Sequence, residues 1–237
     1  TYSRPMRAYL AAAVREAVRP SRRNCVLWSV CGITLAIQIL SVVLLKDGQI
    51  FDWEVEVTRQ IQRIPNRMDI FDVFLVLTNT IAWEFVPIFL VVLAAMWLLH
   101  QREAAALLLL AFPLHVLAQW PKAVLDRPRP PHGYDVAGAG GLQSFPSGHA
   151  EFVITFWGFV VYVAMLQTSR PAIRHAILAG WLVLVAGTGV GRIAIGRHWP
   201  VDVLVSYLVG LGLLSGLIWL HTALLAARQK AQSSPPA

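Results

Sequence analysis

A series of long apolar runs constrains this chain more than any other feature of its sequence. Residues 25–45 form the first run, 21 positions without a charged side chain. As a helix rising about 1.5 Å per residue, such a run crosses the hydrocarbon core of a bilayer. Only 14% of the 237 residues are charged, whereas soluble domains carry about 25%. The sequence therefore predicts an integral membrane protein and excludes a disordered chain or a soluble domain.

Five further apolar runs follow, which predicts six membrane spans. Their residues are 25–45, 81–99, 104–120, 152–166, 176–190 and 201–226. Between the first two spans, residues 68–80 are apolar over only about half a span, so an interfacial or re-entrant helix is expected there. The predicted fold is all-α, a six-helix membrane bundle with this interfacial helix.

The net charge is +7, and the positions of the lysines and arginines predict the orientation of the bundle. Six arginines precede the first span, and the positive-inside rule places them in the cytoplasm. Both termini are therefore predicted to be cytoplasmic in a plasma (inner) membrane. Residues 1–24 form a basic segment that meets anionic bilayer lipids, residues 25–226 the membrane domain, and residues 227–237 a disordered polar tail. This distribution accounts for the excess of basic over acidic residues. A nucleic acid is therefore not expected as a partner.

Three polar clusters interrupt the apolar pattern. Residues 122–130 follow the third span, residues 145–149 precede the fourth, and residues 191–202 connect the fifth and sixth. In a bundle of six alternating spans, all three clusters fall on the outer face. Their co-location predicts an outward-facing functional site.

Three cations in these clusters indicate what the site binds. Lys122, Arg129 and Arg192 lie on the outer side, against the positive-inside rule, where they would repel one another and lose hydration. A phosphoryl group offsets both effects, because arginine forks match phosphate oxygens in pairs and lysine adds a point charge. The Pro-Ser-Gly-His sequence is typical of a helix start, with Ser147 at the N-cap and Gly148 leaving the amides open to an anion.

Two histidines supply candidate reacting groups. Pro200 suits the first position of a helix, which places Asp202 in the first turn within reach of His198. A carboxylate there would orient the imidazole, so His198 is a candidate nucleophile and His149 a candidate general acid. This set predicts phosphoryl transfer through a phosphohistidine. The adjacent cations oppose a divalent ion at the histidines, so neither a metal nor another cofactor is expected.

The order of these motifs resembles the type 2 phosphatidic acid phosphatase family, whose pattern is K-x6-R-P, then P-S-G-H, then R-x5-H-x3-D. The matches run from Lys122 to Pro130, over residues 146–149, and from Arg192 to Asp202. The resemblance implies a helical, metal-independent membrane phosphatase that acts on lipid phosphates or isoprenoid diphosphates. It also implies the phosphate-site architecture that this family shares with the vanadium haloperoxidases.

The resemblance assigns roles residue by residue. Five positions match phosphate-binding residues of the family: Lys122, Arg129, Ser147, Gly148 and Arg192. The resemblance further implies that His198 attacks phosphorus, that Asp202 supports it, and that His149 protonates the leaving group. The third motif usually begins Ser-Arg, whereas Gly191 precedes the arginine here, so one hydroxyl is missing.

Other polar residues receive simpler interpretations. Glu84, near the outer end of the second span, is a possible contact for a substrate head group or a motif arginine. Glu151 is expected to be structural, and Asp126 and Arg127 to pair locally. Cys25 and Cys31, six apart on one helix, fit neither a disulfide nor a zinc site. Four tryptophans are predicted to line the outer membrane interface: Trp53, Trp83, Trp120 and Trp199.

The sequence thus predicts an enzyme that hydrolyses a phosphoric monoester or a diphosphate and whose substrate is a membrane lipid. Phosphatidic acid, phosphatidylglycerol phosphate and undecaprenyl diphosphate all fit this prediction. Two alternatives stay open, a lipid phosphotransferase that uses the same histidine and a non-catalytic membrane subunit that retains the fold.

Overall fold

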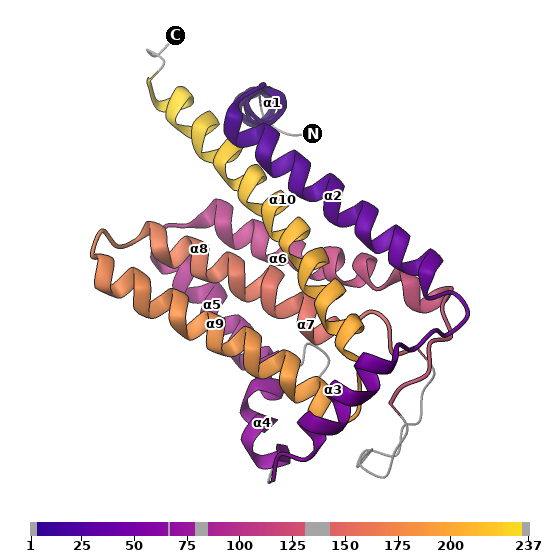
Figure 1. The fold of residues 1–237 in the computed structure, drawn as a ribbon. Coiled ribbons are helices and arrows are strands. Elements are labelled where there is room, and N and C mark those ends of the chain that lie inside the picture. The colour runs from indigo at the N-terminus through magenta and orange to yellow at the C-terminus, as the bar shows by residue number, and fades with distance from the viewer. Residues whose placement is uncertain (1–3, 66, 79–84, 131–142, 234–237) are drawn as a thin grey trace.

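The computed structural model describes residues 4–65, 67–78, 85–130 and 143–233. All regular elements within these ranges are helices, which confirms the all-α prediction (Figure 1). The longer helices are α2 (Arg22–Leu44), α6 (Arg102–Ala118), α9 (Pro171–Ala194) and α10 (Pro200–Ser233). The shorter ones are α1 (Arg4–Val18), α3 (Asp52–Gln62), α4 (Arg67–Val76) and α5 (Phe85–Leu98).

Two of the membrane helices are composite. Helix α7 (Gly148–Phe152), the π-helical turn η2 (Val153–Trp157) and α8 (Gly158–Leu166) follow one another without a break. They form one apolar helix of 19 residues. Helix α6 is followed closely by the 3-10 turn η1 (Trp120–Ala123). With these, the described residues contain five helices long and apolar enough to cross a membrane.

The six-span prediction is only partly matched. Helix α5, at the position of the second predicted span, has 14 residues, which extend about 21 Å at the usual helical rise. Residues 79–84 of that predicted span lie outside the described residues. Between the first two predicted spans the structure has two short helices, α3 and α4, where the sequence predicted one over residues 68–80.

Helix α10 organises the bundle. It packs against α1, α2, α6 and α7 (Figure 1). Glycines permit its closest contacts: a Cβ on Gly212 would lie 1.9 Å from the Thr34 hydroxyl oxygen of α2, and one on Gly210 would lie 2.7 Å from the Glu151 carbonyl oxygen of α7. The third turn of α10 thereby lies directly against α7.

An aromatic cluster fills the core between α5, α6 and the composite helix. The Phe152 and Phe156 rings stack with centroids 4.8 Å apart, and Phe85 meets both edge-on at 5.4 Å. Phe89 and Phe112 pack beside them at 4.9 Å from each other. Ring pairs at these distances add to the stabilisation from area burial, so this cluster anchors α5 to the bundle despite its short length.

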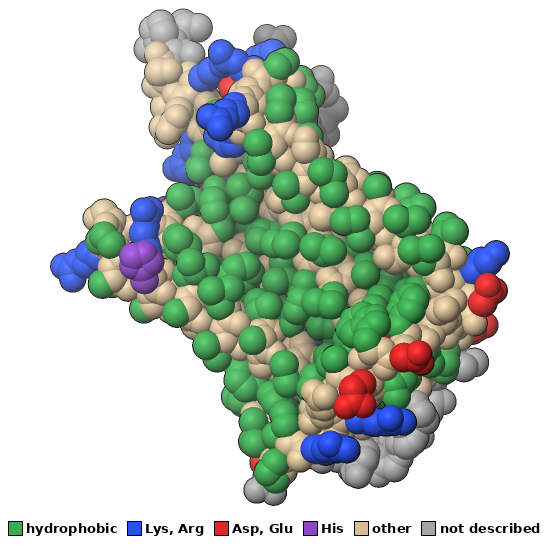
Figure 2. All heavy atoms as spheres, viewed as in Figure 1, with side chains coloured by type: hydrophobic (Ala, Val, Ile, Leu, Met, Phe, Trp, Pro, Cys, Tyr) green, Lys and Arg blue, Asp and Glu red, His purple; other side chains and the backbone are tan. Residues whose placement is uncertain are grey.

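The other end of α10 carries the charged terminal segments. Helix α1 packs along it, and Lys230 pairs with Glu16 while the Tyr9 hydroxyl approaches the Leu224 carbonyl oxygen at 3.5 Å. Helix α10 continues through Ser233, so residues 227–233 of the predicted disordered tail are helical. Apolar side chains cover the middle of the face in Figure 2, with charged side chains gathered toward its ends. This pattern indicates a multi-pass membrane protein.

Candidate active site

The polar clusters of the sequence meet at one end of the bundle. Lys122 lies in η1, and Arg192 lies in the last turn of α9. Ser147 is the residue directly before α7. His198 lies in the connection between α9 and α10, and Asp202 in the first turn of α10. Pro200 is the first residue of α10 and Gly148 the first of α7. Both helix starts that the sequence predicted are therefore confirmed.

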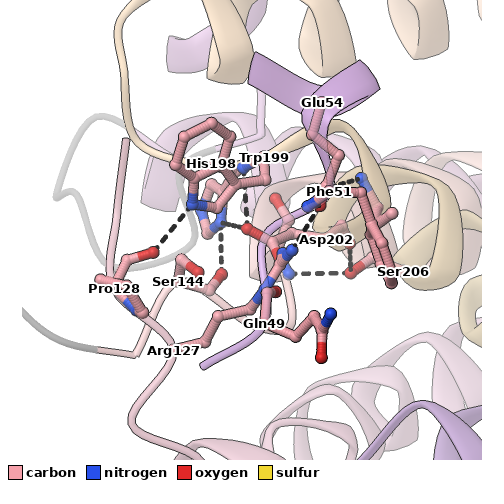
Figure 3. Close-up of polar contacts among 12 residues, drawn as sticks. Gln49, Phe51, Glu54, Arg127, Pro128, Ser144, His198, Trp199, Asp202 and Ser206 are labelled. Atoms are coloured by element: carbon pink, nitrogen blue, oxygen red, sulfur yellow. Dashed lines mark hydrogen bonds and ion pairs between the residues drawn. The ribbon is translucent and has the colours of Figure 1, made fainter. Parts of the chain in front are cut away.

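His198 is held by the segment that leads into α7. Its side chain is 3% exposed, and its Nδ1 lies 2.5 Å from the carbonyl oxygen of Ser144 (Figure 3). A carbonyl can only accept a hydrogen bond, so Nδ1 carries the proton and donates it. The second ring nitrogen, Nε2, then keeps the lone pair that a nucleophile or a base requires.

Electrostatics keep the His198 imidazole neutral. Burial lowers its pKa well below the ordinary value of 6.5, and the cations Arg192, Lys122 and Arg129 lower it further in that order. All three cations are therefore near enough to the imidazole to act on it electrostatically. A neutral, oriented imidazole surrounded by cations is suited to attack an anionic phosphorus centre, which the cations attract.

Asp202 is placed differently from its predicted role. Its Oδ2 lies 3.8 Å from His198 Nδ1, beyond hydrogen-bond distance, and accepts the backbone N–H of Trp199 at 2.8 Å. Its Oδ1 pairs with Arg127. The Ser144 carbonyl therefore makes the hydrogen bond that orients His198, and Asp202 acts on the imidazole from a longer distance.

Arg127 is the residue whose importance the sequence did not reveal. It is fully buried, and it pairs with Glu54 of α3 at 2.7 Å and with Asp202 (Figure 3). Its Nε donates to the Gln49 carbonyl oxygen at 3.0 Å. The prediction that it pairs with its neighbour Asp126 is therefore wrong, because a deeper ion pair with two distant carboxylates was available.

Glu54 extends this network to the start of α10. Its Oε1 accepts the Val201 backbone N–H at 3.1 Å, and its Oε2 accepts that of Phe51 at the same distance. The carbonyl of Arg127 accepts N–H bonds from Gln143 and Ser144, each at 2.9 Å. One buried arginine thus connects α3, the segment before α7 and the start of α10.

Several buried donors near the site have no partner among the described residues. Two of them belong to predicted phosphate-binding residues, the Ser147 hydroxyl and the Arg192 Nε. Ser147 occupies the N-cap position, but its side chain does not cap the helix, and its backbone N–H donates to the Ser206 hydroxyl at 2.8 Å. Buried donors are normally satisfied, so these two are available to an anion.

The other predicted residues lie as follows. His149 is close enough to Arg192 and His198 to interact electrostatically with both. Glu151 is buried and pairs with His115 of α6 and the Thr155 hydroxyl, in keeping with a structural role. Glu84 lies outside the described residues.

The tryptophans that the sequence predicted at the membrane interface differ in their exposure. Trp53 and Trp120 are exposed, at 47% and 40%, whereas Trp199 is 2% exposed, which contradicts its predicted place in the belt. The Trp199 indole N–H donates to the Pro128 carbonyl oxygen at 2.8 Å. It therefore connects the first and third polar clusters instead of facing lipid. Trp83 lies outside the described residues.

Comparison with known proteins identifies the family. The profile of the PAP2 superfamily matches residues 85–225, which is more than half of the chain. This chain belongs to the PAP2 superfamily. The matched region contains all the predicted site residues from Lys122 to Asp202, whereas Glu54 lies outside it. The Arg127–Glu54 pair therefore connects the PAP2 region to a helix that precedes it.

Two curated relatives show how far the similarity extends. Phosphatidylglycerophosphatase B of Escherichia coli (strain K12) is 35% identical over 77 residues, 32% of this chain and 28% of the relative. The putative undecaprenyl-diphosphatase YbjG of the same organism is 29% identical over 143 residues, 56% of this chain and 66% of the relative. The matches thus cover less than two thirds of each relative. No solved structure matches the chain significantly.

The structure also gives a reason for the glycine before Arg192 in this PAP2 chain. A Cβ on Gly191 would lie 2.9 Å from the Cβ of Phe71, on α4. A Cβ on Gly187, one turn earlier, would lie 2.5 Å from the ring of Phe74. Helix α4 packs against α9 through these two glycines, so a serine at position 191 would require Phe71 to move.

Proposed function

We propose that this protein is a membrane phosphatase that hydrolyses a lipid phosphate or an isoprenoid diphosphate through a phosphohistidine on His198, without a metal ion. The observation that carries the proposal is the buried imidazole. Its Nδ1 is hydrogen-bonded to the Ser144 carbonyl, and its pKa is lowered by Lys122, Arg129 and Arg192. These features favour a neutral nucleophile in a site built for an anion.

The phosphoryl group would be held by donors from three elements. Lys122, Arg129 and Arg192 supply the positive charge, the Ser147 hydroxyl supplies a buried donor, and Gly148 leaves the first amides of α7 accessible. The unpartnered Ser147 hydroxyl and Arg192 Nε support this assignment. The same groups would stabilise the charge that develops on the equatorial oxygens in the transition state.

The reaction would proceed in two displacements. His198 Nε2 attacks phosphorus, the bond from phosphorus to the leaving oxygen breaks, and His149 gives its proton to that oxygen. The leaving group is the lipid alcohol of a monoester or the isoprenoid monophosphate of a diphosphate. His149 then takes a proton from water, which attacks the phosphohistidine and releases inorganic phosphate and free His198. Asp202, held by Arg127 and 3.8 Å from the imidazole, would stabilise positive charge on His198.

The apolar part of the substrate has a candidate groove. A groove of about 460 Å³ lies between α2, α6 and α10, and its apolar lining includes Leu114, Leu117, Leu213 and Trp120. Trp120 is two residues before Lys122. A lipid chain in this groove would therefore have its head group beside the cationic site.

The arrangement of α10 supports an outward-facing site. The site is at the first turn of α10, whereas the basic helix α1 packs toward its other end, near Lys230 (Figure 1). The 34 residues of α10 extend about 51 Å, longer than the hydrocarbon core. Together with the positive-inside rule, this separation supports the proposal that both termini are cytoplasmic and that the site is on the outer face of the plasma membrane.

The test is phosphate release from purified protein in detergent with a chelator present. Wild type should release phosphate, and protein quenched in an alkaline denaturant should carry a phosphoryl group that is stable in base and lost in acid. His198→Ala should lose both, whereas His175→Ala, at an exposed histidine of α9, should keep both. Full activity in His198→Ala, or loss on chelation, would overturn the mechanism. Phosphorus NMR of the products distinguishes phosphate release from transfer to a second lipid.

A further inference from the structure

Two glutamines near η1, the buried Gln38 and the half-buried Gln119, differ in the hydrogen bonds that their side chains make. Gln38 of α2 uses both ends of its carboxamide: Nε2 donates to the Ala118 carbonyl oxygen at 2.8 Å, and Oε1 accepts the Trp120 indole N–H at 3.3 Å. In Gln119, both carboxamide atoms are buried, and neither has a partner among the described residues. The fold therefore satisfies one glutamine and leaves the other without hydrogen bonds.

The Gln119 carboxamide lies at the candidate active site. Its Oε1 is 3.4 Å from the position that a Cβ on Gly148 would occupy. Gly148 is the first residue of α7 and lies between Ser147 and His149. The Gln119 carbonyl oxygen also accepts the backbone N–H of Lys122 at 3.0 Å. The carboxamide thus lies between the turn that carries Lys122 and the helix start that carries His149.

The course of α6 indicates which part of the substrate Gln119 would meet. Helix α6 ends at Ala118 and η1 carries Lys122, so Gln119 lies between the apolar helix and Lys122 along the chain. In a lipid phosphate, the group that connects the phosphoryl to the apolar chain has the corresponding position. His149, the proposed donor to the leaving oxygen, is next to Gly148 in the chain. Gln119 is therefore placed beside the leaving group.

An unpaired carboxamide is costly to bury, because it gives up its hydrogen bonds to water. A ligand with matching groups removes that cost when it binds. A carboxamide offers one acceptor and two N–H donors. The hydroxyl of a glycerol head group can both donate and accept, whereas the oxygens of an ionised diphosphate only accept. A hydroxyl-bearing head group therefore fits both ends of Gln119.

We propose that Gln119 is a substrate-contacting residue that hydrogen-bonds the leaving group of a glycerol-type lipid phosphate and favours it over an isoprenoid diphosphate. This inference deepens the proposed function and rests on it. Gln119 is three residues before the first motif lysine, and the sequence alone gave it no role.

The test compares three substrates in mixed micelles at a fixed detergent ratio. Lysophosphatidic acid carries a free glycerol hydroxyl, farnesyl diphosphate has an isoprenoid diphosphate, and p-nitrophenyl phosphate has an aryl leaving group without a hydroxyl. For Gln119→Leu, kcat/KM should fall about threefold to tenfold for lysophosphatidic acid, the size expected for one neutral hydrogen bond. The other two substrates should change less than twofold.

Gln38→Leu is the matched control. It removes a buried glutamine whose hydrogen bonds are internal, so it should lower the melting temperature. Gln38 also lines the apolar groove that both lipid chains would occupy, so the ratio of kcat/KM between lysophosphatidic acid and farnesyl diphosphate should stay unchanged. An equal fall for all three substrates in Gln119→Leu would show a structural role, and no fall would show that only a buried water occupies the site. A larger fall for farnesyl diphosphate would overturn the assignment to a glycerol head group. A wild type inactive on all three substrates would instead refute the proposed function.

Discussion

Replacing Arg127 by methionine should cost this protein much of its stability and nearly all its activity. The guanidinium is fully buried and lies between the carboxylates of Glu54 and Asp202, which are also fully buried. Methionine fills part of the space but leaves both carboxylates without a cation. It also removes the donor to the Gln49 carbonyl oxygen.

The expected magnitude follows from these contacts. Removing one partner of a buried ion pair destabilises a protein by about 3–5 kcal/mol, because the other charge stays buried and unpaired. Arg127 has two such partners, so the upper part of this range applies. For a chain of this size each kcal/mol lowers the melting temperature by about 2–4 °C, so Arg127→Met should melt roughly 8–20 °C below wild type. The variant also removes the Arg127–Asp202 ion pair that positions Asp202, so kcat should fall as well as the melting temperature.

The assay is thermal unfolding in detergent, followed by tryptophan fluorescence, with phosphatase activity measured well below the transition. Arg59→Met, at an exposed arginine of α3, is the control and should melt within about 2 °C of wild type. The double variant Arg127→Met/Glu54→Gln should recover part of the loss, because only one unpaired carboxylate remains. If Arg127→Met alone has the melting temperature of wild type, the argument that this arginine connects α3, the segment before α7 and the start of α10 is refuted.

Two further predictions concern the candidate nucleophile His198 and the contact between α10 and α7 at Gly210. Because the pKa of His198 is lowered, the neutral imidazole persists as the pH falls, so kcat/KM corrected for the substrate's own ionisation should not fall as the pH drops from 8 to 6.5. A fall on the acid side of the corrected profile with a midpoint at or above pH 6.5 would contradict this. Gly210→Ala would place a Cβ 2.7 Å from the Glu151 carbonyl oxygen and should lower stability by about 1–3 kcal/mol, measured as a lower melting temperature and reduced activity. Gly180→Ala, with nothing within 4 Å, should instead be neutral or stabilising by up to about 1 kcal/mol; equal effects of the two changes would contradict the packing argument.

The sequence by itself determined the membrane class, most of the long helices and the order of the chemical motifs. These features are local. An apolar run must satisfy its backbone internally in lipid and therefore forms a helix, and Pro200 and Ser147 mark helix starts through their own backbone preferences. The motif residues Lys122, His149 and His198 could be assigned because their spacing along the chain carries the pattern.

Only the tertiary structure decided how those residues are held. Arg127 and Glu54 are 73 positions apart, and no local pattern indicates that they pair in the interior. Trp199 is buried and donates to the Pro128 carbonyl oxygen, and the Gln119 carboxamide lies without a partner beside Gly148, which has no side chain to offer one. Whether a polar side chain is paired, buried or free depends on which helices pack together. Packing brings together segments that are distant in the chain, so the network that positions His198 could not be predicted from the sequence alone.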